Sequence, residues 1–226
     1  SYDGIKDKLP EYLKGYFDAA MVAQLDWFGE NIFDRMLTVD VLEQLSQIID
    51  FQKDERSFSD LKLVFSTTFL GYKMAQFERI TCLNKLATKC HVSLYTDKSN
   101  DELIGVDVIG SVNYENDMPK VFNRSKVNMN FTIRNIRSGI PLRVWDVLGA
   151  GGFLLTNFQA ELPSLFENGK HIVYYESIDD MLNKAQYYLT HDEEREQIAK
   201  NGHALVSQYH SYEKRLEQIL SIVQSV

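Results

Sequence analysis

The segment richest in residues suited to chemistry spans 132–152, TIRNIRSGIPLRVWDVLGAGG. It leaves a predicted strand and enters a predicted helix near Pro141, which suits a helix start because a first turn does not need the missing N–H. Ser138 is a candidate cap for this helix. Because the N–H groups and dipole of a helix start attract anions, the segment predicts a diphosphate site beyond the strand. Arginines strengthen this prediction, and the segment contains Arg134, Arg137 and Arg143.

The predicted helix places a carboxylate near the arginine of its first turn. Gly139, Arg143 and Asp146 are spaced by four and then three residues, so they share one helix face. Asp146 is therefore a candidate acceptor for both hydroxyls of a ribose. The glycines at 149–152 are expected to end the helix and let the backbone pass closely into the next strand. Two plainer interpretations stay open: an ion pair between Arg143 and Asp146, and glycines that form only a helix end.

A second candidate for phosphate contact is the polar stretch 66–73, after a strand predicted over Leu61–Thr67 (LKLVFST). Thr67 offers a hydroxyl and Lys73 a positive charge, just before a helix predicted over 74–89. An ordinary polar loop without a ligand is the alternative interpretation.

Composition and charge exclude other kinds of site. The chain has 226 residues, 44% hydrophobic and 25% charged, which is typical of a globular protein. The net charge of −8 disfavours nucleic-acid binding, because an acidic surface repels phosphate backbones. No apolar run reaches the roughly 18–20 residues of a membrane span, and we expect a cytoplasmic protein. Since the sequence begins at Ser1 and not at Met, we expect it to be part of a longer protein.

No metal site is expected. The two cysteines and five histidines have no spacing typical of metal ligands, and no Asp-x-Asp pair occurs in the chain. Positive charge for a bound diphosphate would then come from a helix start and from arginine or lysine.

The elements that must position these residues change in character along the chain. Residues 1–58 are predicted to be a helical linker or subdomain, since apolar residues recur at helical spacing over 10–25 and 39–51. Over 59–226, short apolar strands alternate with helices, which predicts parallel pairing through right-handed crossovers. Besides 61–67, strands are predicted at 91–95, 106–109, 127–132, 153–156 and 172–175; further helices are predicted at 119–124, 142–148, 177–190, 192–208 and 212–224.

This alternation predicts an α/β fold, a doubly wound, Rossmann-like parallel sheet of five or six strands preceded by a helical segment. Ligands of such sheets bind beyond the carboxyl ends of the strands. The loops expected at that edge are 67–73, 96–100, 110–118, 132–141 and 157–161.

Several spaced residues recur together in one known family. They are Arg143-x-x-Asp146-x-x-x-Ala150-Gly151-Gly152, the strand FLLT after them, Glu161-Leu162, and His210-x-Tyr212-x-x-Arg215 near the end of the chain. Together they resemble the C-terminal domain of the CgeB/YkvP-like glycosyltransferases, over about residues 61–222.

The resemblance implies one half of a GT-B-type enzyme, in which two Rossmann-like domains face a cleft. It implies that this half binds a nucleotide-sugar donor, without a further cofactor, while the acceptor binds an N-terminal domain missing from this sequence. Asp146 corresponds to the acidic residue that holds the donor ribose, where the family usually has Glu. Ser138 takes the position of a second Glu of related retaining enzymes, and Glu161 that of the glutamate that opens the next short helix.

The leading hypothesis is therefore the donor-binding domain of a metal-independent glycosyltransferase, with its catalytic residues unassigned. The expected binding residues are Thr67, Lys73, Arg134, Ser138, Gly139, Arg143, Asp146 and Glu161. Two alternatives stay open: a non-catalytic Rossmann-like binding or structural module, and a GT-B-like sugar-nucleotide epimerase.

Overall fold

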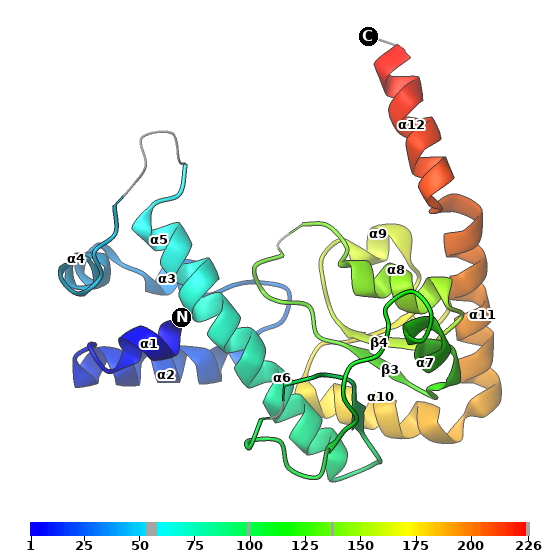
Figure 1. Ribbon diagram of the computed structural model, residues 1–226, viewed down its shortest axis with the longest axis horizontal. Helices are drawn as coiled ribbons and strands as arrows, with labels where there is room; N and C mark the ends of the chain where they lie inside the picture. The colour runs from blue at the N-terminus through cyan, green and yellow to red at the C-terminus, as the bar shows by residue number, and fades with distance from the viewer. Residues whose placement is uncertain (53–57, 99, 137, 225–226) are drawn as a thin grey trace.

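The N-terminal part of the protein consists of helices packed around a core of their own (Figure 1). The computed structural model describes residues 1–52, 58–98, 100–136 and 138–224. The first helices are α1 (Tyr2–Lys6), α2 (Glu11–Leu25), α3 (Phe33–Met36) and α4 (Val39–Ile48). Leu13, Phe17 and Leu45 are fully buried, so the apolar faces of α2 and α4 pack inward as their spacing predicts.

A long helical stretch connects this part to the rest of the chain. It comprises α5 (Leu61–Val64), the π-helical turn η1 (Phe65–Gly71) and α6 (Tyr72–Ala87). The strand predicted over 61–67 is therefore wrong. Asp60 caps the helix, since its carboxylate accepts from the Leu63 backbone N–H at 2.7 Å. Phe65 is fully buried in the N-terminal core. A short apolar run is expected to be buried whether it forms a strand or a helix, so this pattern did not distinguish the two.

The α/β part contains parallel strands in two sheets. One sheet pairs β1 (Ser93–Leu94) with β2 (Asp107–Val108). The other has the order β3 (Asn128–Asn130), β4 (Leu154–Asn157), β5 (Val173–Tyr175), all parallel. The helices of this part, besides α6, are α7 (Met118–Arg124), α8 (Leu142–Gly149), α9 (Leu162–Leu165), α10 (Ile178–Thr190) and α11 (Asp192–Tyr209). The α/β fold with parallel strands is confirmed, although its strands are shorter than predicted and divide between two sheets.

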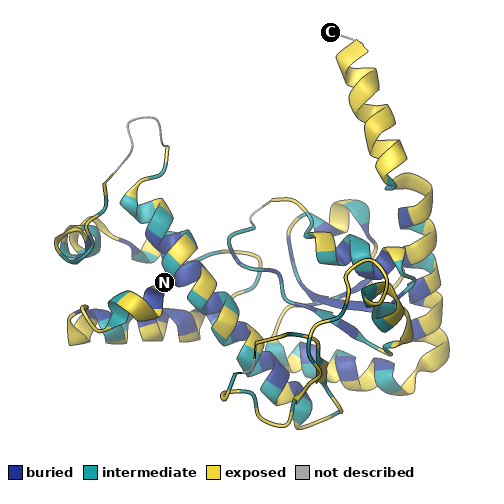
Figure 2. Ribbon diagram, in the orientation of Figure 1, coloured by how far each residue is buried: buried dark blue, intermediate teal, exposed yellow. Residues whose placement is uncertain are grey.

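Helices cover both faces of the three-stranded sheet, because neighbouring residues of a strand point to opposite sides. Leu155 packs in one core cluster with Cys82 of α6 and Met181 of α10. Leu154 packs in the other with Val147 of α8 and residues of α9 and α11. All four residues of β4 are buried, and Figure 2 shows this buried centre between exposed outer helix faces.

Close packing of α11 against α8 depends on Gly202. A Cβ built at this position would lie 2.4 Å from the His171 carbonyl oxygen and 2.8 Å from Leu148 Cδ2. Glycine therefore lets α11 approach the neighbouring backbone more closely than any other residue would allow.

Helix α12 (Tyr212–Gln224) extends away from the α/β part (Figure 1). None of its described residues is buried. Its apolar side chains are more than half exposed at Leu216, Ile219, Leu220 and Val223. Among the described residues, no helix is both long and apolar enough to cross a membrane.

Candidate functional site

The start of α8 lies just beyond the carboxyl end of β3, as predicted, but it is built differently in detail. Pro141 is the N-cap residue and not the first helical residue, and no side chain caps the helix. The expectation that Ser138 caps it is therefore wrong. Ser138 and Gly139 are both exposed, and Gly139 has φ +90°, a conformation that glycine adopts without strain. Arg137 lies outside the described residues.

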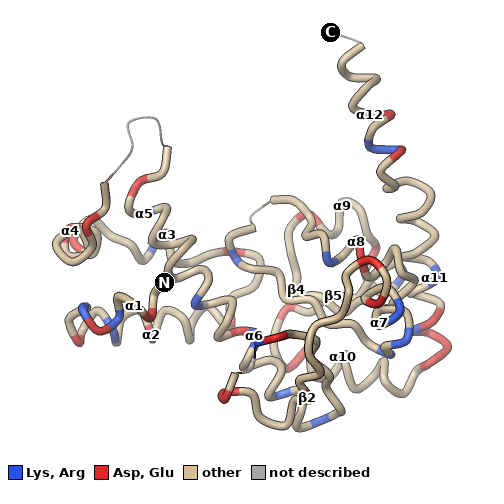
Figure 3. The backbone as a smooth tube through the Cα atoms, in the orientation of Figure 1, with Lys and Arg blue, Asp and Glu red and all other residues tan. Residues whose placement is uncertain are grey.

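Arg143 packs from α8 onto α7. Its Nη1 lies 2.8 Å from Met118 Sδ, and its guanidinium lies 5.0 Å from the centroid of the Phe122 ring. Figure 3 shows both basic and acidic residues around α7 and α8. No ion pair between Arg143 and Asp146 is found among the described residues, so the helical ion pair considered from the sequence is not formed. The guanidinium is thus oriented by a thioether and an aromatic ring, and no carboxylate of the described residues forms an ion pair with it.

Asp146 has a partner that the sequence did not suggest. Its Oδ1 accepts a hydrogen bond of 2.7 Å from the hydroxyl of Tyr114, in the loop between β2 and α7. This bond raises the pKa of Tyr114 above its ordinary value, because it stabilises the protonated phenol. Tyr114 is 55% exposed, so the pair lies at the surface. The loop 110–118 was expected at this edge, but no spacing in the sequence distinguished Tyr114.

Arg134 forms a buried ion pair with Glu78 of α6. Its Nη2 lies 2.8 Å from Oε1 and its Nε 3.2 Å from Oε2, and the two side chains are only 4% and 2% exposed. The guanidinium also lies 4.4 Å from the centroid of the Phe28 ring. Burial raises the pKa of Glu78, while the charge of Arg134 opposes this shift. Arg134 therefore joins the loop after β3 to α6 and to the N-terminal helices.

Thr67 and Lys73 lie on the long helix and not in a loop after a strand. The Thr67 hydroxyl donates to the Leu63 carbonyl at 2.6 Å. Lys73 Nζ pairs with the carboxylate of Asp3 at 2.9 Å. The predicted proximity to the loop after β3 is nevertheless real, since Asn135 Nδ2 donates to the Thr67 carbonyl at 2.7 Å. Lys73 instead contributes its charge to the N-terminal helical part.

Glu161 opens the short helix α9 as predicted. It is the N-cap residue, and its carbonyl accepts from the Ser164 hydroxyl at 2.6 Å. Its own carboxylate makes no capping hydrogen bond. Glu161 thus lies four residues beyond Asn157, the last residue of β4.

A cavity of about 310 Å³ opens at the same carboxyl edge of the sheet. Three segments surround it: the loop and helix α3 around 29–35, the loop after β3 at 132–136, and the loop after β4 at 157–160. Of the predicted binding residues, only Arg134 lines it. The polar lining residues are Glu30, Asn31, Asp34, Arg35, Thr132, Arg134, Asn157 and Gln159. No pattern in the sequence predicted that residues 29–35 would reach this edge, since nothing in the helical segment resembled a site.

Two residues of the cavity wall bind each other. The Asn157 side chain accepts from the Thr132 N–H at 2.8 Å and donates to the Thr132 carbonyl at 3.0 Å, which joins the end of β4 to the chain beyond β3. Within the described residues, no group of three or more His, Cys, Asp and Glu side chains is placed to hold a metal ion.

Comparisons with known proteins give a family and a structural likeness. A family model described as "Glycosyl transferase-like" matches residues 77–221, more than half of the chain. The chain is also similar to the crystal structure of Anabaena Alr3699/HepE in complex with UDP and glucose, with 14% sequence identity and a TM-score of 0.49. The match covers 72% of this chain and 38% of that protein, so this chain spans well under half of its length. A comparison with curated proteins found no match.

Proposed function

Because this chain belongs to the glycosyl transferase-like family, we propose that its α/β part is the donor-binding domain of a GT-B-type glycosyltransferase, related to the CgeB/YkvP-like enzymes. It binds a nucleoside-diphosphate sugar at the carboxyl edge of its sheets. The reaction is displacement of the nucleoside diphosphate from the anomeric carbon by a hydroxyl of the acceptor. The observation that carries the proposal is the uncapped start of α8 at this edge, with Arg143 and Asp146 on the same helix.

In this proposal Asp146 accepts the hydroxyls of the donor ribose. One carboxylate oxygen already accepts a hydrogen bond from the Tyr114 hydroxyl, which supports a role of this position in binding hydroxyl donors. Because Tyr114 is largely exposed, its side chain can move to admit the ribose or lie beside it. An aspartate at this position reaches less far than the glutamate that the related enzymes usually have.

The diphosphate binds at the start of α8. The first N–H groups of the helix have no side-chain cap, so they are open to an anion near Ser138 and Gly139. Arg143, in the first turn, supplies positive charge that stabilises the leaving diphosphate. Glu161 stays in the proposal as a carboxylate just beyond β4. The polar groups of Thr67, Lys73 and Arg134 bind within the protein, so we propose structural roles for these three.

The acceptor is proposed to bind a further, N-terminal domain of the same protein, which supplies the catalytic residues. The helical residues 1–58 then connect the two domains.

A titration of this chain with UDP, GDP, ADP, CMP and dTDP, with and without Mg²⁺, tests the proposal by thermal shift. A ligand at 100 times its dissociation constant stabilises by about 2.7 kcal/mol, which a melting curve resolves. We expect one nucleotide to raise the melting temperature without metal. Asp146→Ala is expected to weaken its binding by about 1–3 kcal/mol, the cost of leaving hydroxyls unpaired.

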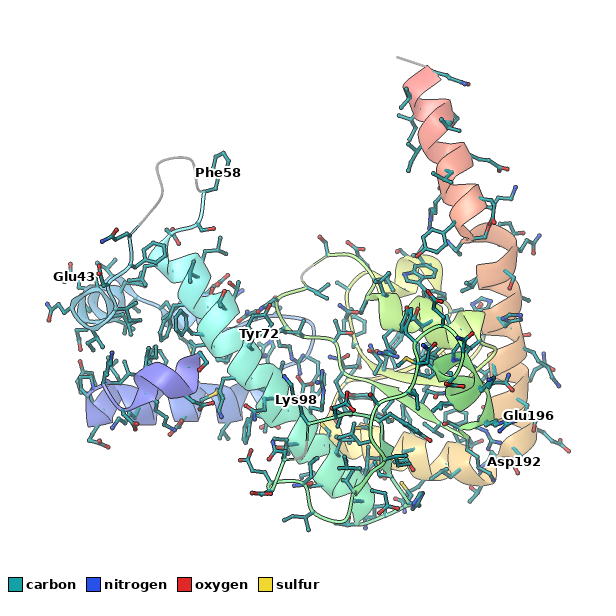
Figure 4. All side chains as sticks on the ribbon, viewed as in Figure 1. Glu43, Phe58, Tyr72, Lys98, Asp192 and Glu196 are labelled. Atoms are coloured by element: carbon teal, nitrogen blue, oxygen red, sulfur yellow. The ribbon has the colours of Figure 1, made fainter. Side chains whose placement is uncertain are left out.

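The matched control is Glu196→Ala, which removes an exposed carboxylate of α11 far from α8 (Figure 4). It is expected to bind the nucleotide like the unaltered protein. A shift that Asp146→Ala and Glu196→Ala leave equally intact would remove Asp146 from the site. No shift with any nucleotide would favour a non-catalytic module.

A further inference from the structure

We infer that helix α7 positions the guanidinium of Arg143 for the diphosphate and leaves its positive charge available to that ligand. Met118 and Phe122 are the positioning residues, because they contact the guanidinium and are themselves uncharged. The inference rests on the proposed function, since it explains how the arginine assigned to the diphosphate is held. It gives α7 a part in binding that no pattern in the sequence predicted.

The side chain of Arg143 extends from α8 to α7, and these two helices pack against each other (Figure 1). Arg143 Nη1 lies 2.8 Å from Sδ of Met118, the first residue of α7. The guanidinium lies 5.0 Å from the ring centroid of Phe122, four residues later and so on the same helix face. A thioether is a weak hydrogen-bond acceptor, and the face of an aromatic ring attracts a cation. Both contacts therefore orient the guanidinium without forming an ion pair.

The carboxylates closest to these residues along the chain bind other groups. Asp117, the N-cap residue of α7, pairs with Lys120 at 3.2 Å. Asp146, three residues after Arg143, accepts from the Tyr114 hydroxyl at 2.7 Å. A protein carboxylate paired with the arginine would compete with an anionic ligand for the same N–H groups. Because no such pair is found in the described part of the chain, these N–H groups remain available to a phosphate.

Arg134 shows the opposite arrangement in the same protein. Its guanidinium also lies near an aromatic ring, 4.4 Å from the centroid of Phe28. It is only 4% exposed, however, and two hydrogen bonds join it to the Glu78 carboxylate. Arg143 is half-buried and is held by uncharged groups. The protein thus supplies a counter-charge to the first arginine, whereas the second can receive one from a ligand.

Helix α7 is itself fixed by hydrogen bonds to backbone carbonyls. Asn123 Nδ2 donates to the Ala150 carbonyl at 2.9 Å, and Asn128 Nδ2 donates to the Phe122 carbonyl at 2.9 Å. A Cβ built at Gly152 would lie 2.6 Å from the same Phe122 carbonyl oxygen, so only glycine lets the chain after α8 approach α7 this closely. The glycines that end α8 therefore also help to position the arginine. A guanidinium held in place beforehand loses less conformational entropy when it binds an anion.

The test replaces Met118 by Glu and by Gln, two side chains of similar size that differ in charge. Glutamate places a carboxylate beside the Arg143 guanidinium, where it pairs with the arginine and repels a diphosphate. We expect Met118→Glu to fold, because an acidic residue is favourable in the first turn of a helix. Met118→Gln keeps an uncharged acceptor at this position. The matched control is Gln186→Glu, which adds the same charge at an exposed position of α10, on the other face of the sheet.

Calorimetry measures the affinity of each protein for UDP, GDP, ADP and dTDP, and ligand-observed NMR measures that for the parent nucleosides. Melting curves establish that each variant is folded. We expect Met118→Glu to weaken diphosphate binding by about tenfold or more, the scale of a lost charge-assisted hydrogen bond. Its affinity for the nucleoside is expected to stay unchanged, because the nucleoside has no phosphate. Met118→Gln and Gln186→Glu are expected to stay within about twofold of the unaltered protein in both affinities.

Four results would overturn the inference while the proposed function stands. The first is diphosphate binding by Met118→Glu as tight as that of the unaltered protein. The second is an equal loss of nucleoside and diphosphate binding in folded Met118→Glu, which would indicate a displaced helix. The third and fourth are losses in Met118→Gln or Gln186→Glu as large as the loss in Met118→Glu, because a carboxylate beside the arginine would then not be the cause.

The unaltered protein distinguishes failure of the proposed function from failure of the inference. If it binds none of the nucleoside diphosphates, the proposed donor site and the inference are both contradicted. If it binds one of them, only the comparison of Met118→Glu with Met118→Gln and Gln186→Glu decides the role of α7.

Discussion

Replacing Glu78 by Gln is expected to destabilise the protein strongly. The Glu78 carboxylate and the Arg134 guanidinium are 2% and 4% exposed and joined by two hydrogen bonds. Glutamine keeps the shape and one acceptor but removes the negative charge. The guanidinium then stays buried against the ring of Phe28 without a counter-charge.

The magnitude follows from this burial. Removing one partner of a buried ion pair costs about 3–5 kcal/mol, because the other charge stays desolvated. The Phe28 ring and the remaining amide oxygen compensate in part, so we expect a loss of about 3 kcal/mol. The matched control is Glu167→Gln at the exposed pair with Lys170, whose side chains are 64% and 56% exposed. Such surface pairs contribute about 0–1 kcal/mol.

Urea unfolding, followed by circular dichroism, measures both losses. A double variant, Glu78→Leu with Arg134→Met, removes both charges and is expected to recover most of the stability lost in Glu78→Gln. If Glu78→Gln costs no more than Glu167→Gln, the buried pair does not have the energetic role assigned to it here.

The remaining predictions concern packing, pH and the C-terminal helix. Gly202→Ala is expected to destabilise by about 1–3 kcal/mol, because the clash with His171 outweighs the roughly 1 kcal/mol that alanine gains in a helix. Gly15→Ala, at an exposed position of α2 with open space around it, is expected to stabilise by about 1 kcal/mol, again measured by urea unfolding. Burial lowers the pKa of His171 and His210 below the ordinary 6.5. The unfolded chain therefore binds more protons, and the melting temperature should fall as pH decreases from about 6.5. Ending the chain at Ser211 should change the free energy of unfolding by less than about 0.5 kcal/mol, since no described residue of α12 is buried.

Each of these predictions has a contradicting result. Equal effects of Gly202→Ala and Gly15→Ala would show that α11 can shift away from the His171 carbonyl. A melting temperature that stays constant from pH 7 to pH 5, or that rises, would contradict the histidine argument. A cooperative loss of stability on truncation would show that α12 packs on the protein.

The sequence predicted most helices and all strands of the α/β part, because strand and helix periods differ clearly there. The single error in element type, over 61–67, arose where the apolar run LKLVFST fits both periods and only the N-terminal core selects the helix. The start of α8 at the carboxyl edge also followed from the sequence. The N-cap residue of α8 was not predicted, because Ser138 and Pro141 lie close together in the sequence and both are suitable at a helix start.

Local sequence patterns did not predict the contacts between residues that are distant in the sequence. Glu78 and Arg134 are 56 positions apart, and Tyr114 and Asp146 are 32 apart. Arginine and lysine in polar segments suggested phosphate contacts, yet tertiary packing pairs Arg134 and Lys73 with carboxylates. The sequence did not predict the cavity, because its walls come from distant parts of the chain that meet only when the N-terminal helices pack on the sheet.

The long helix from Leu61 to Ala87 belongs to both cores of the protein. Phe65 and Met74 lie in the N-terminal cluster, whereas Cys82 and Leu86 lie in the cluster beneath the sheet. Unfolding of either part therefore exposes an apolar face of the same helix, which links the two parts in one cooperative unit. Hydrogen exchange is therefore expected to report on the N-terminal core at the first turns of α6 and on the core of the α/β part at its last turns.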